Sequence, residues 1–205
     1  MKIEKRWIIS FLIISLVSIT ALFWPEQTSL PKPGTFLGEE DIVGSDVAWI
    51  LASSGLVLLM TPGLSFFYGG MVGKKNMIST MLQSFIALGV ISILWVVVGF
   101  SLSFGESIGI TINGQHYGLI GNPTTYSFFN NVGVLPHSQL ASTVPFVLFA
   151  MFQMKFAVIT PALITGSFAE RVRFISYLLF MVLFSLIIYT PLCHMVWHPD
   201  GLLNK

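Results

Sequence analysis

Long, nearly uncharged apolar runs dominate the chain. They lie at residues 7–24 and at about 46–70, 77–105, 140–170 and 174–197. An α-helix rises about 1.5 Å per residue, so about 20 apolar residues cross the hydrocarbon layer of a bilayer. Each run is therefore predicted to span a membrane as a helix. The pattern indicates an all-α membrane protein built as a multi-span helical bundle.

The first 24 residues have the layout of a signal peptide or signal-anchor helix. Lys2, Lys5 and Arg6 precede an uncharged run that ends before Pro25. Small residues (Ser18, Thr20 and Ala21) lie near the end of this run, but without an A-x-A triplet, so both removal and retention of the segment stay open. Residues 25–45 then change to Pro, Gly, Thr and acidic side chains without an apolar period, which is typical of a linker.

The distribution of charge predicts one orientation in the cell membrane. Two short connections are basic, with Lys74 and Lys75 in one and Arg171 and Arg173 in the other. The long 106–137 loop contains no Lys or Arg. Because basic loops are retained in the cytoplasm, we expect these connections to be cytoplasmic, and the 106–137 loop and the acidic 25–45 linker to be external.

The composition argues against a soluble enzyme and against a nucleic-acid-binding protein. The chain has 205 residues, of which 54% are hydrophobic and 9% charged, whereas a soluble domain carries about 25% charged residues, so a soluble enzyme is excluded. A net charge of +1 provides no basic surface for nucleic acid. No nucleophile elbow or phosphate-binding loop is present, and no enzymatic activity or cofactor is predicted.

A metal site is not predicted either. The single cysteine, Cys193, forms neither an internal disulfide nor a thiolate cluster. His194 and His198 have helical i, i+4 spacing, but Pro199 interrupts the helix and only Asp200 could add a third ligand.

Lys155 stands near the middle of the fourth apolar run. A lysine at this depth costs about 2.5–3.5 kcal/mol on insertion scales, and intramembrane charges usually line a cavity or a pathway. A functional role is the first interpretation. The alternative is that Lys155 snorkels or contacts a polar neighbour such as Gln153 or Thr160 in an interface.

Three aromatic residues are candidates for a cation site. Phe152 and Phe156 are one helical turn apart and share a face, and Trp197 closes the last run. Aromatic faces attract cations, and rings at a pore mouth can form a hydrophobic constriction. Taken alone, however, the Phe pair is more typical of core packing and Trp197 of an interfacial anchor.

Several strings between residues 46 and 203 resemble one family. The sequence is similar to the ammonium transporter, methylammonium permease and Rhesus family in collinear order. The matching strings are DVAW at 46–49, TPGLSFFYGG at 61–70, GKKN at 73–76, LWVVVGFSLSFGE at 94–106, FQMKFAVITP at 152–161, GSFAERVRF at 166–174 and PLCHMVW at 191–197.

This resemblance implies a helical channel of two inverted repeats that assembles as a homotrimer, with one pore per subunit for ammonium or ammonia. Phe156 matches the aromatic residue that lines the recruitment site and caps the pore, and Phe152 lies one turn away. Trp197 matches the tryptophan of the recruitment site. The resemblance therefore implies a pore-entrance position for these three residues.

Two departures from the family shape the functional prediction. The family usually has an uncharged residue at the position of Lys155, and a charge about 6 Å from a cation repels it by about 3 kcal/mol at an effective dielectric of about 20. The paired pore histidines fall beyond Lys205, so only a partial fold of four core helices is expected.

We therefore expect an ammonium channel or transporter in a truncated form, inactive on its own. One alternative is an ammonium sensor or regulatory membrane subunit in which Lys155 acts as a pore modulator and impedes conduction. The other is a Rhesus-type gas channel, whose neutral permeant would be indifferent to Lys155. The cation-attracting set of Phe152, Phe156 and Trp197 argues modestly against this last alternative.

Overall fold

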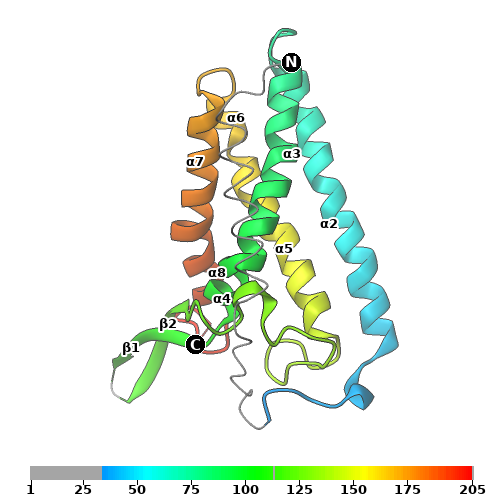
Figure 1. Cartoon of the computed structure of the whole chain (residues 1–205), viewed down its shortest axis with the longest axis vertical. Coiled ribbons are helices and arrows are strands. Elements are labelled where there is room, and N and C mark those ends of the chain that lie inside the picture. The colour runs from blue at the N-terminus through cyan, green and yellow to red at the C-terminus, as the bar shows by residue number, and fades with distance from the viewer. Residues whose placement is uncertain (1–33, 113, 205) are drawn as a thin grey trace, which may run out of the picture. The chain divides into compact units, whose positions relative to one another are not determined.

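A computed structural model describes residues 34–112 and 114–204, which form a bundle of long helices with a β-hairpin at one end (Figure 1). The expected signal or anchor at 1–24, and the linker as far as residue 33, lie outside the described residues. A short 3₁₀ turn, η1 (Glu39–Asp41), precedes the first long helix.

Within the described residues, four continuous helical segments are long and apolar enough to cross a membrane. They are α2 (Gly44–Met71); α3 (Met77–Leu94) with the π-helical turn η2 (Trp95–Gly99) and α4 (Phe100–Phe104); α5 (Phe146–Leu163) with α6 (Thr165–Phe168); and α7 (Phe174–Phe184) with the π-helical turn η4 (Ser185–Tyr189) and α8 (Thr190–Trp197). The prediction of a multi-span helical bundle is confirmed for this part of the chain.

The third of these segments begins later than the expected start near residue 140. Helix α5 begins at Phe146, directly after Pro145, whose backbone is extended with φ −52° and ψ 133°. The Val147 amide in the first turn donates a hydrogen bond to the Gly133 carbonyl at 2.9 Å. The preceding loop thus satisfies a helix-end donor, and residues 140–145 remain outside the helix.

The 106–137 loop contains regular structure that the sequence analysis did not predict. Strands β1 (Ser107–Ile112) and β2 (Gln115–Gly121) form an antiparallel hairpin, and a 3₁₀ turn, η3 (Ser127–Phe129), follows. Gly114, with φ 79°, adopts a left-handed conformation in the connecting turn that glycine accepts without strain. The hairpin is an addition to the all-helical prediction.

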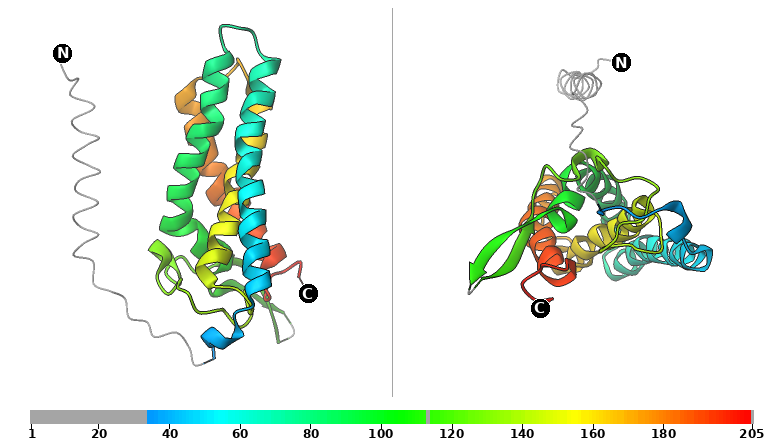
Figure 2. Two further views of the ribbon diagram at one scale, coloured as in Figure 1. Left: turned by 90° about the vertical axis from the view of Figure 1, so that its right-hand side faces the viewer. Right: turned by 90° about the horizontal axis from the view of Figure 1, so that it is seen from below.

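A buried aromatic cluster fixes α5 near the hairpin end of the bundle. The rings of Trp95, Phe100 and Phe104 pack together, with centroids 5.4–6.4 Å apart. The Trp95 indole Nε1 donates a hydrogen bond to the Ala150 carbonyl at 3.1 Å. Helix α5 also packs against α2 and α3 (Figures 1 and 2). The hydrogen bond to Ala150 therefore holds α5 in place two residues before Phe152.

Glu170 joins the two basic turns at the opposite end. Its Oε1 accepts hydrogen bonds from the Asn76 side chain and the Gly73 amide, both at 2.9 Å. These two bonds, the Asn76 bond first, lower the pKa of the exposed Glu170 carboxyl. The carboxylate therefore cross-links the turn that carries Lys74 and Lys75 to the turn after α6.

Candidate functional site

Phe152 and Phe156 lie on a half-open face of α5. Their rings meet edge to face, with centroids 5.1 Å apart and an interplanar angle of 78°. Both side chains are half-buried, whereas Met154, Ala157 and Val158 on the other side of the helix are buried in the core. The pair is therefore not part of the packed interior, and its rings are available to line a passage.

Lys155 lies between these two residues in the sequence, three positions after Phe152, and its side chain is half-buried. Its amino group forms no hydrogen bond or ion pair with residues 34–112 or 114–204. The two polar neighbours do not neutralise it: the Thr160 hydroxyl donates to the Phe156 carbonyl at 2.7 Å, and Gln153 is buried. Lys155 is thus a cation without a counter-charge in the described part of the chain.

Trp197 is the last residue of α8, and its side chain is 63% exposed. Within the described residues no ring contact joins its indole to Phe152 or Phe156, which contact each other. The structure thus brings the two phenylalanines together, and it leaves Trp197 as a separate, exposed aromatic side chain at the hairpin end of the bundle.

His194 and His198 stack at the end of α8, with ring centroids 4.4 Å apart. His194 is fully buried and bonds to Ser103 and Ser107, so neither ring nitrogen is free for a metal. Burial first, and the neighbouring His194 second, lower the pKa of His198 to about 4. Among the described residues no cluster of three His, Cys, Asp or Glu side chains has metal-binding geometry.

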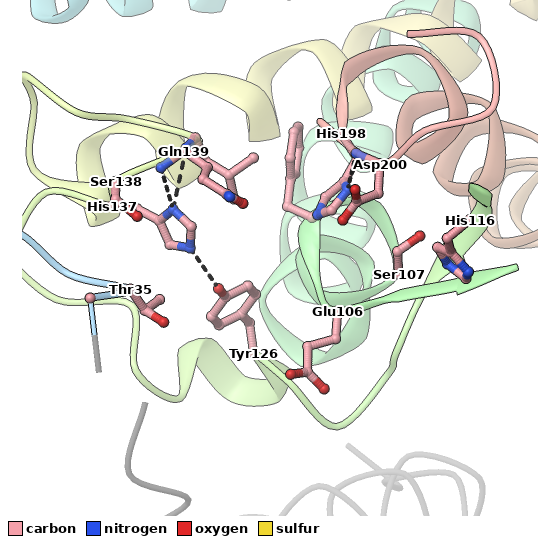
Figure 3. Close-up of a pocket in the computed structure, with 13 residues that line it drawn as sticks. Thr35, Glu106, Ser107, His116, Tyr126, His137, Ser138, Gln139, His198 and Asp200 are labelled. Atoms are coloured by element: carbon pink, nitrogen blue, oxygen red, sulfur yellow. Dashed lines mark hydrogen bonds between the residues drawn. The ribbon is translucent and has the colours of Figure 1, made fainter. Parts of the chain in front are cut away.

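A polar pocket of about 520 Å³ lies at the hairpin end, and the sequence analysis missed it (Figure 3). It is lined by Gly34, Thr35, Phe104, Glu106, Ser107, His116, Tyr126, His137, Ser138, Gln139, Leu140, His198 and Asp200. The one available signal was a pair of histidines, His116 and His137, in a loop without Lys or Arg. Their partners come from distant segments, so no local pattern predicted the pocket.

His137 organises one wall of this pocket as a neutral ring. Its Nδ1 accepts hydrogen bonds from the Gln139 and Leu140 amides, both at 3.2 Å, so the proton lies on Nε2 and is donated to the Tyr126 hydroxyl at 3.2 Å (Figure 3). Burial lowers the pKa of His137. Burial, and then the Glu106 charge, raise the pKa of Tyr126 to about 12. The pocket therefore offers hydrogen-bonding groups, with no charge on His137 or Tyr126 at neutral pH.

Comparisons with known proteins extend this picture. An ammonium transporter of Mycobacterium tuberculosis (strain H37Rv) is 43% identical over 169 residues, which are 77% of this chain and 34% of the relative. One of Bacillus subtilis is 44% identical over 152 residues, which are 74% of this chain and 35% of that protein. The chain thus spans about a third of the length of these relatives.

Solved structures show the same arrangement of helices. Mep2 of Saccharomyces cerevisiae superimposes with a TM-score of 0.66 and 32% identity, over 78% of this chain and 33% of that one. A structure described as a sensor Amt protein gives a TM-score of 0.63 and 28% identity, over 76% of this chain and 36% of that one. The sequence profile of the Ammonium Transporter Family matches residues 48–205. The fold, the sequence relatives and this profile together place the chain in the ammonium transporter family.

Proposed function

We propose that this chain forms one wall of a pore for ammonium or ammonia. The observation that carries the proposal is the half-open face of α5, where Phe152 and Phe156 meet edge to face outside the packed core. Ring faces attract a cation, and apolar rings favour loss of its water before it enters a narrow conduit. The ammonium transporters that the chain resembles support ammonium as the substrate.

Trp197 completes the proposed entrance. It lies at the hairpin end, which we propose is external, and its exposed indole can meet a cation arriving from the solvent. The basic turns that Glu170 joins, with Lys74 and Arg171, are then cytoplasmic, which agrees with the retention of basic loops on that side. The entrance residues and the basic turns thus fall at opposite ends of the bundle.

The proposed pore needs a second wall. The described segments cover the face of α5 that carries Phe152, Lys155 and Phe156 only in part, since all three side chains remain half-buried. We propose that the opposite wall comes from further protein and that the 205 residues do not conduct alone. Homotrimer assembly, with one pore per subunit, completes the proposal; the strongly exposed apolar side chains of α2, such as Leu56 and Phe66, are suited to lipid or to such neighbours.

A second candidate function is an ammonium sensor or regulatory membrane subunit. The specific observation behind it is Lys155, which shares the face of Phe152 and Phe156 and has no counter-charge in residues 34–112 and 114–204. A fixed charge there opposes the passage of a cation but not its recognition at the entrance. A Rhesus-type gas channel is the third candidate, because a neutral permeant would be little affected by this charge.

Substitution of the entrance aromatics tests the main proposal. The chain is completed with the remaining part of the Bacillus subtilis relative and expressed in cells that lack their own ammonium transporters, and methylammonium uptake is measured. We expect Phe156→Ala and Trp197→Ala to reduce uptake about tenfold, since each removes a cation contact or a constriction. Phe67→Ala, at a 60% exposed position on α2, is the matched control and should leave uptake unchanged. Equal effects of Phe67→Ala and Phe156→Ala would contradict the proposal.

A further inference from the structure

The last turn of α8 is held by groups from outside its own helix, although its terminal residue is exposed. Trp197 has most of its side chain in the open, so packing of the indole does not fix its direction. Residue 194, three positions earlier on the same helix, is fully buried. The location of Trp197 therefore depends on how the end of the helix that carries it is anchored.

His194 links the end of α8 to two other segments by hydrogen bonds. Its Nδ1 lies 3.0 Å from the Ser103 carbonyl of α4, and a carbonyl only accepts, so Nδ1 carries a hydrogen and donates. Its Nε2 lies 2.9 Å from the Ser107 hydroxyl at the start of β1. In the neutral ring, Nε2 accepts from this hydroxyl. One side chain thus ties α8 to the end of α4 and to the hairpin.

The backbone of β2 forms hydrogen bonds with the residues just after α8. The Gly118 amide donates to the Asp200 carbonyl at 2.7 Å, and the Leu202 amide donates to the Gly118 carbonyl at 3.0 Å. Figure 1 shows β2 beside α8, and Ser107 and Asp200 flank the pocket in Figure 3. The chain just after Trp197 is therefore held by β2.

Gly118 is required for this close approach. A Cβ atom at position 118 would lie 2.8 Å from the Asp200 carbonyl oxygen and 2.9 Å from His194 Nε2, closer than real Cβ contacts come. Gly133, in the loop before α5, has nothing within 4 Å of a built Cβ. The two glycines offer a matched comparison between a residue inside this contact and one outside it.

We infer that His194, supported by Ser107 and Gly118, is a positioning residue that fixes where the end of α8 places Trp197. Only the role given to Trp197 rests on the proposed function, because the hydrogen bonds exist whatever passes the entrance. His194 is not itself a pore residue, since its ring is fully buried and both nitrogens are engaged. Its effect on a permeant is exerted through Trp197.

The test uses the full chain in lipid nanodiscs, labelled with 5-fluorotryptophan and observed by ¹⁹F NMR. The chain contains five tryptophans, and Trp197→Phe assigns the line of interest. We expect His194→Ala to split or broaden the Trp197 line while the lines of Trp49 and Trp95 keep their positions. His194→Asn should restore a single Trp197 line, because its Nδ2 can replace the Nδ1 donor to Ser103. Gly118→Ala should disturb this line, and Gly133→Ala should not.

Two results would overturn the inference. In the first, the Trp197 line is the same in wild type and His194→Ala. In the second, His194→Ala or Gly118→Ala changes all tryptophan lines together, which is the signature of a general structural role. Neither result depends on ammonium.

Uptake by the completed transporter separates this inference from the proposed function. If Trp197 recruits the substrate, His194→Ala raises the KM for methylammonium about fivefold and leaves the maximal rate largely intact. A disturbed Trp197 line with an unchanged KM supports the positioning role and counts against the entrance function of Trp197.

Discussion

At the scale of single residues, burial distinguishes roles that residue type alone leaves open. Phe146 and Phe156 are both on α5, but Phe146 is fully buried in the aromatic cluster and Phe156 is half-buried on the open face. The i, i+4 spacing that predicted a shared face for Phe152 and Phe156 could not say which way that face points. The same holds for Lys155, whose lack of a partner in the described part of the chain depends on tertiary packing.

Lys155 provides the first residue-scale prediction. Removing a cation from the face of the proposed entrance aromatics should lower the barrier to ammonium, so Lys155→Met in the completed transporter should raise methylammonium uptake. Lys155→Arg keeps the charge and should leave uptake near the wild-type rate. The initial rate of labelled methylammonium uptake measures both. If Lys155→Met and wild type take up methylammonium equally fast, Lys155 does not impede conduction.

A second prediction concerns acid sensitivity. Burial, and then the neighbouring His194, lower the pKa of His198 to about 4 from 6.5, so the folded state favours the neutral ring. This contribution to the free energy of unfolding is complete above pH 6.5 and is lost as the pH falls toward 4. The thermal midpoint of the chain in nanodiscs should therefore drop between pH 7 and pH 4.5, and less so for His198→Gln. An equal drop in the variant would assign the effect to other groups, among them His137, whose pKa is lowered in the same sense.

At the scale of elements, hydrophobic length predicted the long helices well, and local turn chemistry explains the differences. The membrane-crossing segments follow from long runs of apolar residues that no charge cluster interrupts. The hairpin was not predicted although its signal is in the sequence, where Ile108, Ile110 and Ile112 alternate before the turn dipeptide Asn113-Gly114. These isoleucines are about half exposed, so their burial contributes little to the position of the hairpin. Its position depends instead on Gly118 and on hydrogen bonds to residues about 80 positions later.

The contact between the second and third membrane segments gives an element-scale prediction. Trp95→Phe removes the indole donor to the Ala150 carbonyl and leaves a small void in the aromatic cluster, so the free energy of unfolding should fall by about 2 kcal/mol. Trp49→Phe, at a 73% exposed position on α2, should change it by less than about 0.5 kcal/mol. Reversible unfolding in mixed micelles measures both values. Similar losses for the two variants would show that the Trp95 contact does not hold α5.

At the scale of the whole molecule, the described residues form a helical bundle with one half-covered face, which we propose lines a pore. The core is continuous around the aromatic cluster and the inner side of α5, whereas Phe152 and Phe156 lie outside this core and are half-buried. This matches the extent of the similarity, since the chain spans about a third of its relatives. The family and the helical bundle could be predicted from the sequence, but the pocket around His137 and the hydrogen bonds of His194 could not, because both depend on contacts between distant segments.

We propose that these residues supply one wall of an ammonium pore that needs a second wall. Methylammonium uptake in cells without their own ammonium transporters tests it most directly, with the 205-residue chain compared with the same chain completed by the remaining part of the Bacillus subtilis relative. Membrane content of both proteins is matched by quantitative immunoblot. We expect uptake by the completed protein and only background uptake by the chain alone. Strong uptake by the chain alone, or none by the completed protein, would contradict it.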